Sequence, residues 1–150
     1  MAYLVSKAIT DVRRVLNDDT EDVWTDDDII AYVNEAILII KNTIPIYFDT
    51  LVEIDDSADT IEIESVYKPL ITLFASARCF EQDEQDYRGQ KQMNEFESRR
   101  VEMEDKILDS DAYQAKLDAA ILAGTVTEDY VRDVYFEDYS EEDEIADLEP

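Results

Sequence analysis

The stretch Trp24-Thr-Asp-Asp-Asp-Ile-Ile-Ala-Tyr-Val-Asn-Glu-Ala-Ile37 carries the clearest helix-start signal in the chain. Thr25 can cap the helix, and Asp28 stands where the return partner of a capping box belongs, with Asp replacing the usual Glu or Gln. Trp24 before the cap and Ile29 at the fourth helical position have the spacing of a hydrophobic staple. The positive end of the helix dipole favours the three aspartates of the first turn. These signals predict a helix whose start and direction are closely specified, which is typical of an architectural element and not of a reaction centre.

Composition limits the class of protein and of partner. The chain has 150 residues, with 39 Asp plus Glu against 13 Lys plus Arg, and its formal net charge is −26. Nonspecific binding to nucleic acid or to an anionic membrane needs basic residues that displace counterions, so this balance argues against both. Apolar residues make up 45% of the chain and recur periodically, unlike those of a disordered chain. With few glycines and prolines, the composition predicts one mainly α-helical domain.

Four helices are expected before residue 109, because apolar residues recur there at helical spacing. Pro45 prevents a simple continuation of the second helix, and Pro69 fits the first turn of the third. Ile30, Leu38 and Ile39 widen the apolar stripe of the second helix, which predicts a central position or contacts with partners on two sides. The expected spans are about 3–17, about 26–44, from between 66 and 69 to at least 80, and about 90–108.

Between the second and third helices the period changes to two. Residues 51–55 and 60–64 alternate between apolar and mostly acidic side chains, and the segment that joins them is short and turn-like. We therefore predict a small β-hairpin over about 51–64. Two strands alone are marginal in water, so this hairpin is expected to lie against the helices or against a neighbouring subunit.

Beyond residue 109 the sequence predicts a C-terminal arm. An alanine-rich helix is expected over 110–123 and ends at Gly124, and a further short helix follows it. The last 14 residues, 137–150, contain eight acids and no base. The chain is therefore divided into a helical core, 1–109, and a helical arm with an acidic tail, 110–150.

Four aromatic residues of the arm fall within ten residues of one another. Two of its tyrosines lie at i, i+4 and share a helix face with a valine one turn earlier. Amphipathic aromatic residues are common interface anchors, so this stretch is expected to bind a groove on another chain. The alternative is that it folds back on the core. The candidate interface residues are Tyr130, Val131, Tyr135, Phe136 and Tyr139.

No arrangement of residues indicates catalysis. The chain has no histidine, which removes Ser-His-Asp and Cys-His nucleophiles and nearly all zinc sites. Neither glycine belongs to a phosphate-binding loop, and the single cysteine, Cys79, falls on an apolar helix face, where a small buried hydrophobe is expected. Segments 18–22 and 55–59 resemble the start of an EF-hand loop but lack its glycine at position six and its glutamate at position twelve. We expect no catalytic residue, no metal site and no cofactor.

Two segments carry a recognisable family pattern. The first is Val15-Leu-Asn-Asp18 followed by Trp24-Thr-Asp-Asp-Asp-Ile-Ile-Ala-Tyr-Val-Asn-Glu-Ala36, with Pro45 after the helix. The second is Pro69-Leu-Ile-Thr-Leu-Phe-Ala-Ser-Ala-Arg-Cys-Phe-Glu-Gln-Asp83, followed by a helix with an aromatic residue at Phe96. Together they resemble the head-to-tail adaptor (connector, or head-completion and neck) proteins of tailed bacteriophages. The resemblance covers about residues 5–108 and the order helix, helix, hairpin, helix, helix.

The resemblance implies a fold, a function and a set of partners. The fold is a four-helix adaptor-type bundle, with a small β-hairpin between its second and third helices. The function is that of a structural virion protein without catalysis, in a ring that usually has twelve subunits. The implied partners are the portal protein, the neighbouring adaptor subunits and the next neck or tail protein. The C-terminal segment commonly reaches onto the portal.

An adaptor ring also has an expected place and an expected relation to DNA. The ring docks beneath the portal at the DNA-exit vertex of the virion. DNA passes through it without sequence-specific binding, and an acidic wall repels phosphate. No segment approaches the ~20 apolar residues of a membrane span, and no secretory signal is expected, so synthesis in the cytoplasm of the bacterial host is the simplest inference.

Two other functions fit the charge. One is an acidic DNA-mimic inhibitor, whose clustered carboxylates imitate phosphates. The other is an acidic assembly chaperone of a basic partner. Binding by either should weaken steeply with salt, whereas contacts between apolar helices should resist it.

Overall fold

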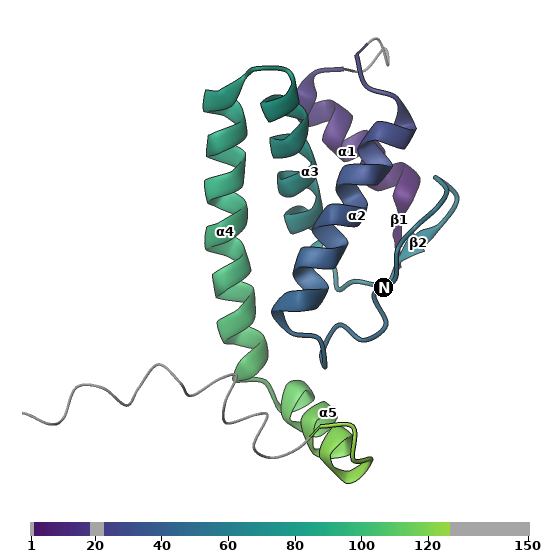
Figure 1. The fold of residues 1–150 in the computed structure, drawn as a ribbon, viewed down its shortest axis with the longest axis vertical. Helices are drawn as coiled ribbons and strands as arrows, with labels where there is room; N and C mark the ends of the chain where they lie inside the picture. Colours follow the sequence, from purple (N-terminus) through teal and green to yellow (C-terminus); the bar gives the residue numbers. More distant parts are fainter. Residues whose placement is uncertain (1, 19–22, 127–150) are drawn as a thin grey trace, which may run out of the picture.

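The computed structural model describes residues 2–18 and 23–126, which are mainly α-helical (Figure 1). In chain order the elements of this part are β1 (Tyr3–Leu4), α1 (Val5–Leu16), α2 (Asp26–Thr43), β2 (Thr60–Ile61), α3 (Lys68–Gln82), α4 (Asp86–Leu108) and α5 (Asp111–Leu122). None of these helices is long and apolar enough to cross a membrane.

Helix α3 is the element against which α1, α2 and α4 all pack. It runs between α4 and the α1–α2 pair in Figure 1. Nine of its residues are buried, so three of its sides require cover. Phe74 of α3 meets Phe96 of α4 edge to face, with ring centroids 5.1 Å apart. The apolar sequence of α3 therefore sets where the other three helices lie.

The helix expectations are largely confirmed. Helix α2 starts at Asp26 as expected, Pro69 lies in the first turn of α3, and Cys79 is fully buried. Helix α4 starts at Asp86, one turn earlier than the spacing predicted. In contrast, α2 is not enclosed, because Leu38 on its outer side is 58% exposed.

The predicted β-hairpin over 51–64 is wrong in its pairing. Strand β2 pairs antiparallel with β1, with Tyr3 opposite Ile61, and residues 51–55 form no strand. The Asn34 side chain of α2 makes the backbone hydrogen bonds of Ile54 that a partner strand would have made. Its amide nitrogen donates to the Ile54 carbonyl and its amide oxygen accepts from the Ile54 N–H, both at 2.9 Å. Alternate residues are buried only in the second segment, at Ile61 and Ile63; in the first, Ile54 is buried but Val52 is exposed, so the period-two pattern there did not indicate a strand.

Helix α5 joins the same hydrophobic cluster as the helices before it. Ser110 caps it by accepting a hydrogen bond from the Tyr113 N–H at 3.1 Å, and Gly124 follows its end with a left-handed φ of 69°. Tyr113 and Leu117 are buried in the cluster. The Lys116 ammonium donates to the Tyr47 carbonyl at 2.9 Å and to the Asp49 carboxylate at 2.7 Å. Helix α5, the first part of the expected arm, is therefore hydrogen-bonded through Lys116 to Tyr47 and Asp49, in the segment that follows α2.

Gly89 lets α4 approach α3 closely near their connection. A Cβ at this position would lie 3.2 Å from the Ala77 carbonyl oxygen and 3.0 Å from the Glu81 Cγ. Both distances are shorter than ordinary van der Waals contact, and the carbonyl belongs to a buried helix that cannot move freely.

We expect Gly89→Ala to lower the melting temperature. Alanine favours a helix interior over glycine by about 1 kcal/mol, but overpacking typically costs about 1–3 kcal/mol. Thermal unfolding followed by circular dichroism checks this, with Gln90→Ala on the exposed side of α4 as the control. A Gly89→Ala protein at least as stable as the wild type would contradict the close contact.

Candidate functional site

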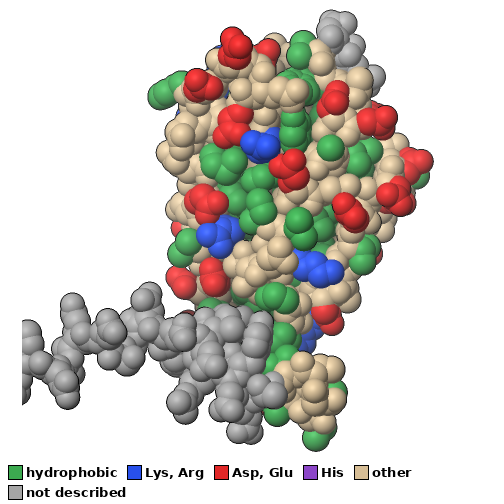
Figure 2. All heavy atoms as spheres, in the orientation of Figure 1, with side chains coloured by type: hydrophobic (Ala, Val, Ile, Leu, Met, Phe, Trp, Pro, Cys, Tyr) green, Lys and Arg blue, Asp and Glu red, His purple; other side chains and the backbone are tan. Residues whose placement is uncertain are grey.

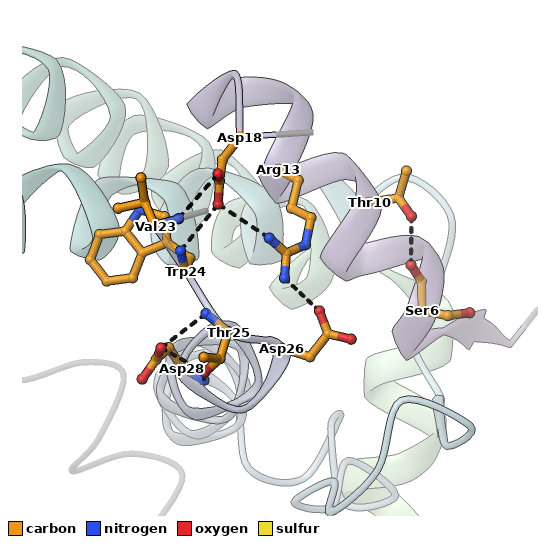
Figure 3. A network of polar contacts seen from close by, with 9 residues as sticks. All are labelled: Ser6, Thr10, Arg13, Asp18, Val23, Trp24, Thr25, Asp26 and Asp28. Atoms are coloured by element: carbon orange, nitrogen blue, oxygen red, sulfur yellow. Dashed lines mark hydrogen bonds and ion pairs between the residues drawn. The ribbon is translucent and has the colours of Figure 1, made fainter. Parts of the chain in front are cut away.

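A buried ion pair fixes the junction between α1 and α2 (Figure 3). Arg13 Nη1 lies 3.2 Å from Asp18 Oδ2, and Arg13 Nη2 lies 2.6 Å from Asp26 Oδ1 at the start of α2. Only 7% of the Arg13 and Asp18 side chains is exposed. Asp18 also accepts a hydrogen bond from the Trp24 N–H at 3.2 Å. The Asp18 carboxylate thus binds both Arg13, near the end of α1, and the backbone of Trp24, just before the N-cap of α2.

The capping box predicted at the start of α2 is present. The Thr25 hydroxyl accepts from the Asp28 N–H at 3.2 Å, and the Asp28 carboxylate accepts from the Thr25 N–H at 3.0 Å. These reciprocal bonds satisfy two backbone donors that the helix itself leaves unpaired. Trp24 and Ile29 are both buried, and the Trp24 ring meets Tyr32 edge to face. All four predicted residues at this helix start are therefore structural.

The five residues proposed for the portal interface lie outside the described residues. They are Tyr130, Val131, Tyr135, Phe136 and Tyr139. The last described helix, α5, ends eight residues before the first of them.

The outer side of α2 carries an exposed apolar residue, Leu38, beside a groove. Leu38 lines a groove of about 580 Å³ together with Ala31 and Leu51. Val52, next to Leu51 in the chain, is 63% exposed. On the face shown in Figure 2, apolar side chains reach the surface between scattered carboxylates and a few basic groups. We take this surface, defined by the exposed Leu38 and Val52 and called the α2 edge below, as the candidate protein-binding site.

In the two acidic segments that resemble EF-hand loops, Asp18 and Asp59 make hydrogen bonds within the chain. Asp59 accepts from the backbone N–H groups of Asp55 and Asp56, at 2.9 and 3.0 Å. Asp18 is engaged with Arg13. Within 2–18 and 23–126 there is no group of three or more potential ligands placed to hold a metal ion.

Cys79 is a packing residue. It is fully buried on α3, and desolvation raises the pKa of its thiol to about 12. Formation of the reactive thiolate is therefore disfavoured at neutral pH.

No family model, no curated protein and no solved structure matches the chain. The functional inference therefore depends on its residues and their geometry.

The sequence did not lead us to predict the ion pairs of Arg13 with Asp18 and Asp26, which we call the Arg13 clamp. The position of Arg13 on α1 was nevertheless a signal that it has a partner. Arg13 lies four residues after Ile9 and one after Val12, within the buried face of α1. A base in such a stripe requires a partner, because burying an unpaired charge is very costly. Nearby acids are so numerous in this chain that the sequence alone does not single out Asp18.

We expect Asp18→Ala to lower the free energy of unfolding by about 2–3 kcal/mol, because it removes a buried acceptor from Arg13 and from the Trp24 N–H. Chemical denaturation measures the change. Glu95→Ala is the matched control, because its pair with Arg99 is largely exposed and should contribute less than about 0.5 kcal/mol. Equal costs for the two variants would show that the clamp does not stabilise the fold.

The Asp28 capping bond predicts a pH-dependent contribution to stability. Hydrogen bonds from the hydroxyl and backbone N–H of Thr25 lower the pKa of the Asp28 carboxyl. A carboxyl with a lowered folded-state pKa stabilises the fold above its unfolded pKa, about 3.9, and loses that contribution as the pH falls through the folded value.

Asp28→Asn should therefore lower the melting temperature more at pH 6 than at pH 3. Asp27→Asn, which removes a charge from the same helical turn outside the capping box, is the control for the general charge effect. Identical pH profiles for the two variants would argue against the capping contribution.

Proposed function

We propose that this chain is a structural virion protein, a subunit of the head-to-tail adaptor ring that docks on the portal and joins it to the next neck or tail component. The resemblance of residues 5–108 to phage adaptors supports this proposal. So does the order of elements: α1 and α2, a connecting segment with one short strand, then α3 and α4. In this proposal α1–α4 form the adaptor-type four-helix bundle, and the connecting segment takes the place of the family's hairpin.

The single observation that carries the proposal is the α2 edge. Leu38, which lines the groove, and Val52, which is next in the chain to the groove residues Leu51 and Glu53, are both exposed and available for contact with another chain. Ring subunits require apolar surface beyond that of their own core, because each contacts two neighbours through different faces. We propose that the α2 edge packs against a neighbouring adaptor subunit, in a ring of about twelve.

The negative net charge of the chain is compatible with a ring through which DNA passes. At a net charge of −26 the protein repels phosphate and does not hold the DNA by nonspecific contacts. The ring would thus form part of the DNA-exit channel at the portal vertex, after synthesis of the protein in the bacterial cytoplasm.

The arm provides a route to the portal. Helix α5 is fixed to the core by Tyr113 and by Lys116, so the chain leaves the core at a defined point. We propose that the aromatic stretch Tyr130–Tyr139, which follows this point, binds the portal.

Co-expression with the portal protein of the same virus tests the proposal. We expect a ring stacked on the portal that survives sedimentation in high salt, because the contacts are mostly apolar, and that electron microscopy makes visible. Leu38→Asp should abolish the ring while leaving the circular dichroism spectrum unchanged. Val101→Asp is the control, because Val101 is also an exposed apolar helix residue, on α4.

Two outcomes would contradict this proposal. One is a folded protein that does not bind the portal, and the other is a ring that tolerates Leu38→Asp as well as Val101→Asp. Binding to a basic partner that weakens steeply with salt would instead favour the DNA-mimic inhibitor or the acidic chaperone, which the net charge supports.

A further inference from the structure

A groove with a basic rim lies between α1, α3 and α4, although the protein is strongly acidic. Its volume is about 530 Å³. Four of the 13 basic residues of the chain line it: Lys7 and Arg14 from α1, Lys68 from α3 and Arg99 from α4. Two carboxylates, Asp11 and Glu95, are the only acids of the lining.

The cations of this rim are only partly neutralised. Lys7 and Arg14 share Asp11, with nitrogen–oxygen distances of 2.6 and 3.6 Å. Lys68 lies over the Tyr3 ring at 5.1 Å and has no carboxylate within ion-pairing distance among the described residues. The rim therefore carries two more positive than negative charges, in a molecule where acids outnumber bases threefold.

The groove also has apolar walls. Val15, Pro69 and Leu73 line it between the basic groups, and Val15 is partly exposed. An apolar surface flanked by cations fits a peptide that carries apolar side chains among carboxylates. DNA fits it poorly, because the acids on the rest of the surface repel the backbone on either side of such a short groove.

The C-terminal segment of this same chain has the matching composition. Residues 141–148 read Glu-Glu-Asp-Glu-Ile-Ala-Asp-Leu, with five acids and no base. Ile145 and Leu148 are the large apolar residues of this stretch, three positions apart. The segment therefore offers carboxylates for the rim and two apolar side chains for the walls.

The segment is long enough to reach the groove of its own chain. Residues 127–140 join the last described residue to this segment and span up to about 50 Å when extended. The groove is lined in part by residues of α4, and the whole of this helix, whose end precedes α5, is only about 34 Å long. A tether of this length gives the segment an effective local concentration in the millimolar range.

We propose that the groove between α1, α3 and α4 is an acidic-peptide site that binds residues 141–148 of the same chain. Ile145 and Leu148 contact the apolar walls, and the carboxylates meet Lys7, Arg14, Lys68 and Arg99. This inference does not rest on the adaptor proposal, because it concerns a different face and a different segment.

Carbodiimide cross-linking of the full-length protein tests it. The reagent joins a lysine amine to a carboxylate as an amide and takes up the released water as its urea. No base follows Arg132, so trypsin releases 133–150 as one peptide that mass spectrometry identifies. We expect links from this peptide to Lys7 or Lys68, with a yield that falls several-fold in 1 M NaCl.

Lys116 is the internal control. It is the lysine nearest to the segment in the sequence and its side chain is 40% exposed, but it lies outside the groove. Links spread over Lys116 and the groove lysines alike would overturn the proposal, because they would indicate unspecific charge contacts.

One double variant and one pair of single variants distinguish binding in the groove from general charge attraction. Ile145→Ser with Leu148→Ser keeps every charge and should lower the yield at least about threefold, since apolar contacts are lost. Arg99→Gln should also lower it, whereas Arg88→Gln, which changes a base of α4 outside the groove, should leave it unchanged. An unchanged yield in the serine variant would overturn the proposal.

A mixture of ¹⁴N- and ¹⁵N-labelled protein identifies the source of the segment. Links within one copy join peptides with the same label, and we expect this result at micromolar protein. Links that join different labels would show exchange between copies and would overturn the intramolecular assignment.

Discussion

Burial of α3 on three sides is the constraint on which the rest of the structure depends. Its nine buried residues leave little polar surface, so α1, α2 and α4 have to cover it. Gly89 permits a close contact between α4 and α3, because a Cβ there would lie 3.2 Å from the Ala77 carbonyl oxygen. The packing of three helices around α3 then determines which side chains stay exposed. These form the groove beside Leu38, the groove between α1, α3 and α4, and the α2 edge.

The α1–α2 junction sets the direction of α2 and therefore the position of the α2 edge. Arg13 and Asp18 join the end of α1 to the first residues of α2, and the capping box then sets the direction in which α2 leaves. Leu38 lies more than three turns along α2, so its position on the outside depends on that starting angle. The structural residues at the start of the helix and the candidate interface further along it are therefore parts of one element.

Charge is distributed unevenly over this acidic protein. Most carboxylates of residues 2–18 and 23–126 are exposed, while four of the bases gather around one groove. Such a concentration gives the molecule one face that attracts an acidic segment and leaves the remaining faces repulsive to DNA and to other acidic chains. In the proposed adaptor ring both properties would be useful, because DNA would pass freely while the acidic tail would stay at a defined place.

Local chemistry explains why part of this protein was predictable from its sequence. The start of α2, the proline in the first turn of α3, the left-handed Gly124 just after the end of α5 and the burial of Cys79 each depend on residues within a few positions of one another. Helical spacing also placed Leu38 on the side of α2 that widens its apolar stripe. These signals operate in an isolated segment, so a reading of the sequence recovers them.

The pairings across the fold were decided only by the tertiary structure. Strand β2 joins β1, about 57 residues away, because α1 carries Tyr3 to that place, and Asn34 satisfies the backbone of Ile54 that a hairpin partner was expected to satisfy. Asp18 becomes the partner of Arg13, and four distant bases meet around one groove. Each outcome requires the helices to be packed first, since many acids and several strand-like segments compete as partners and only proximity in the fold selects among them.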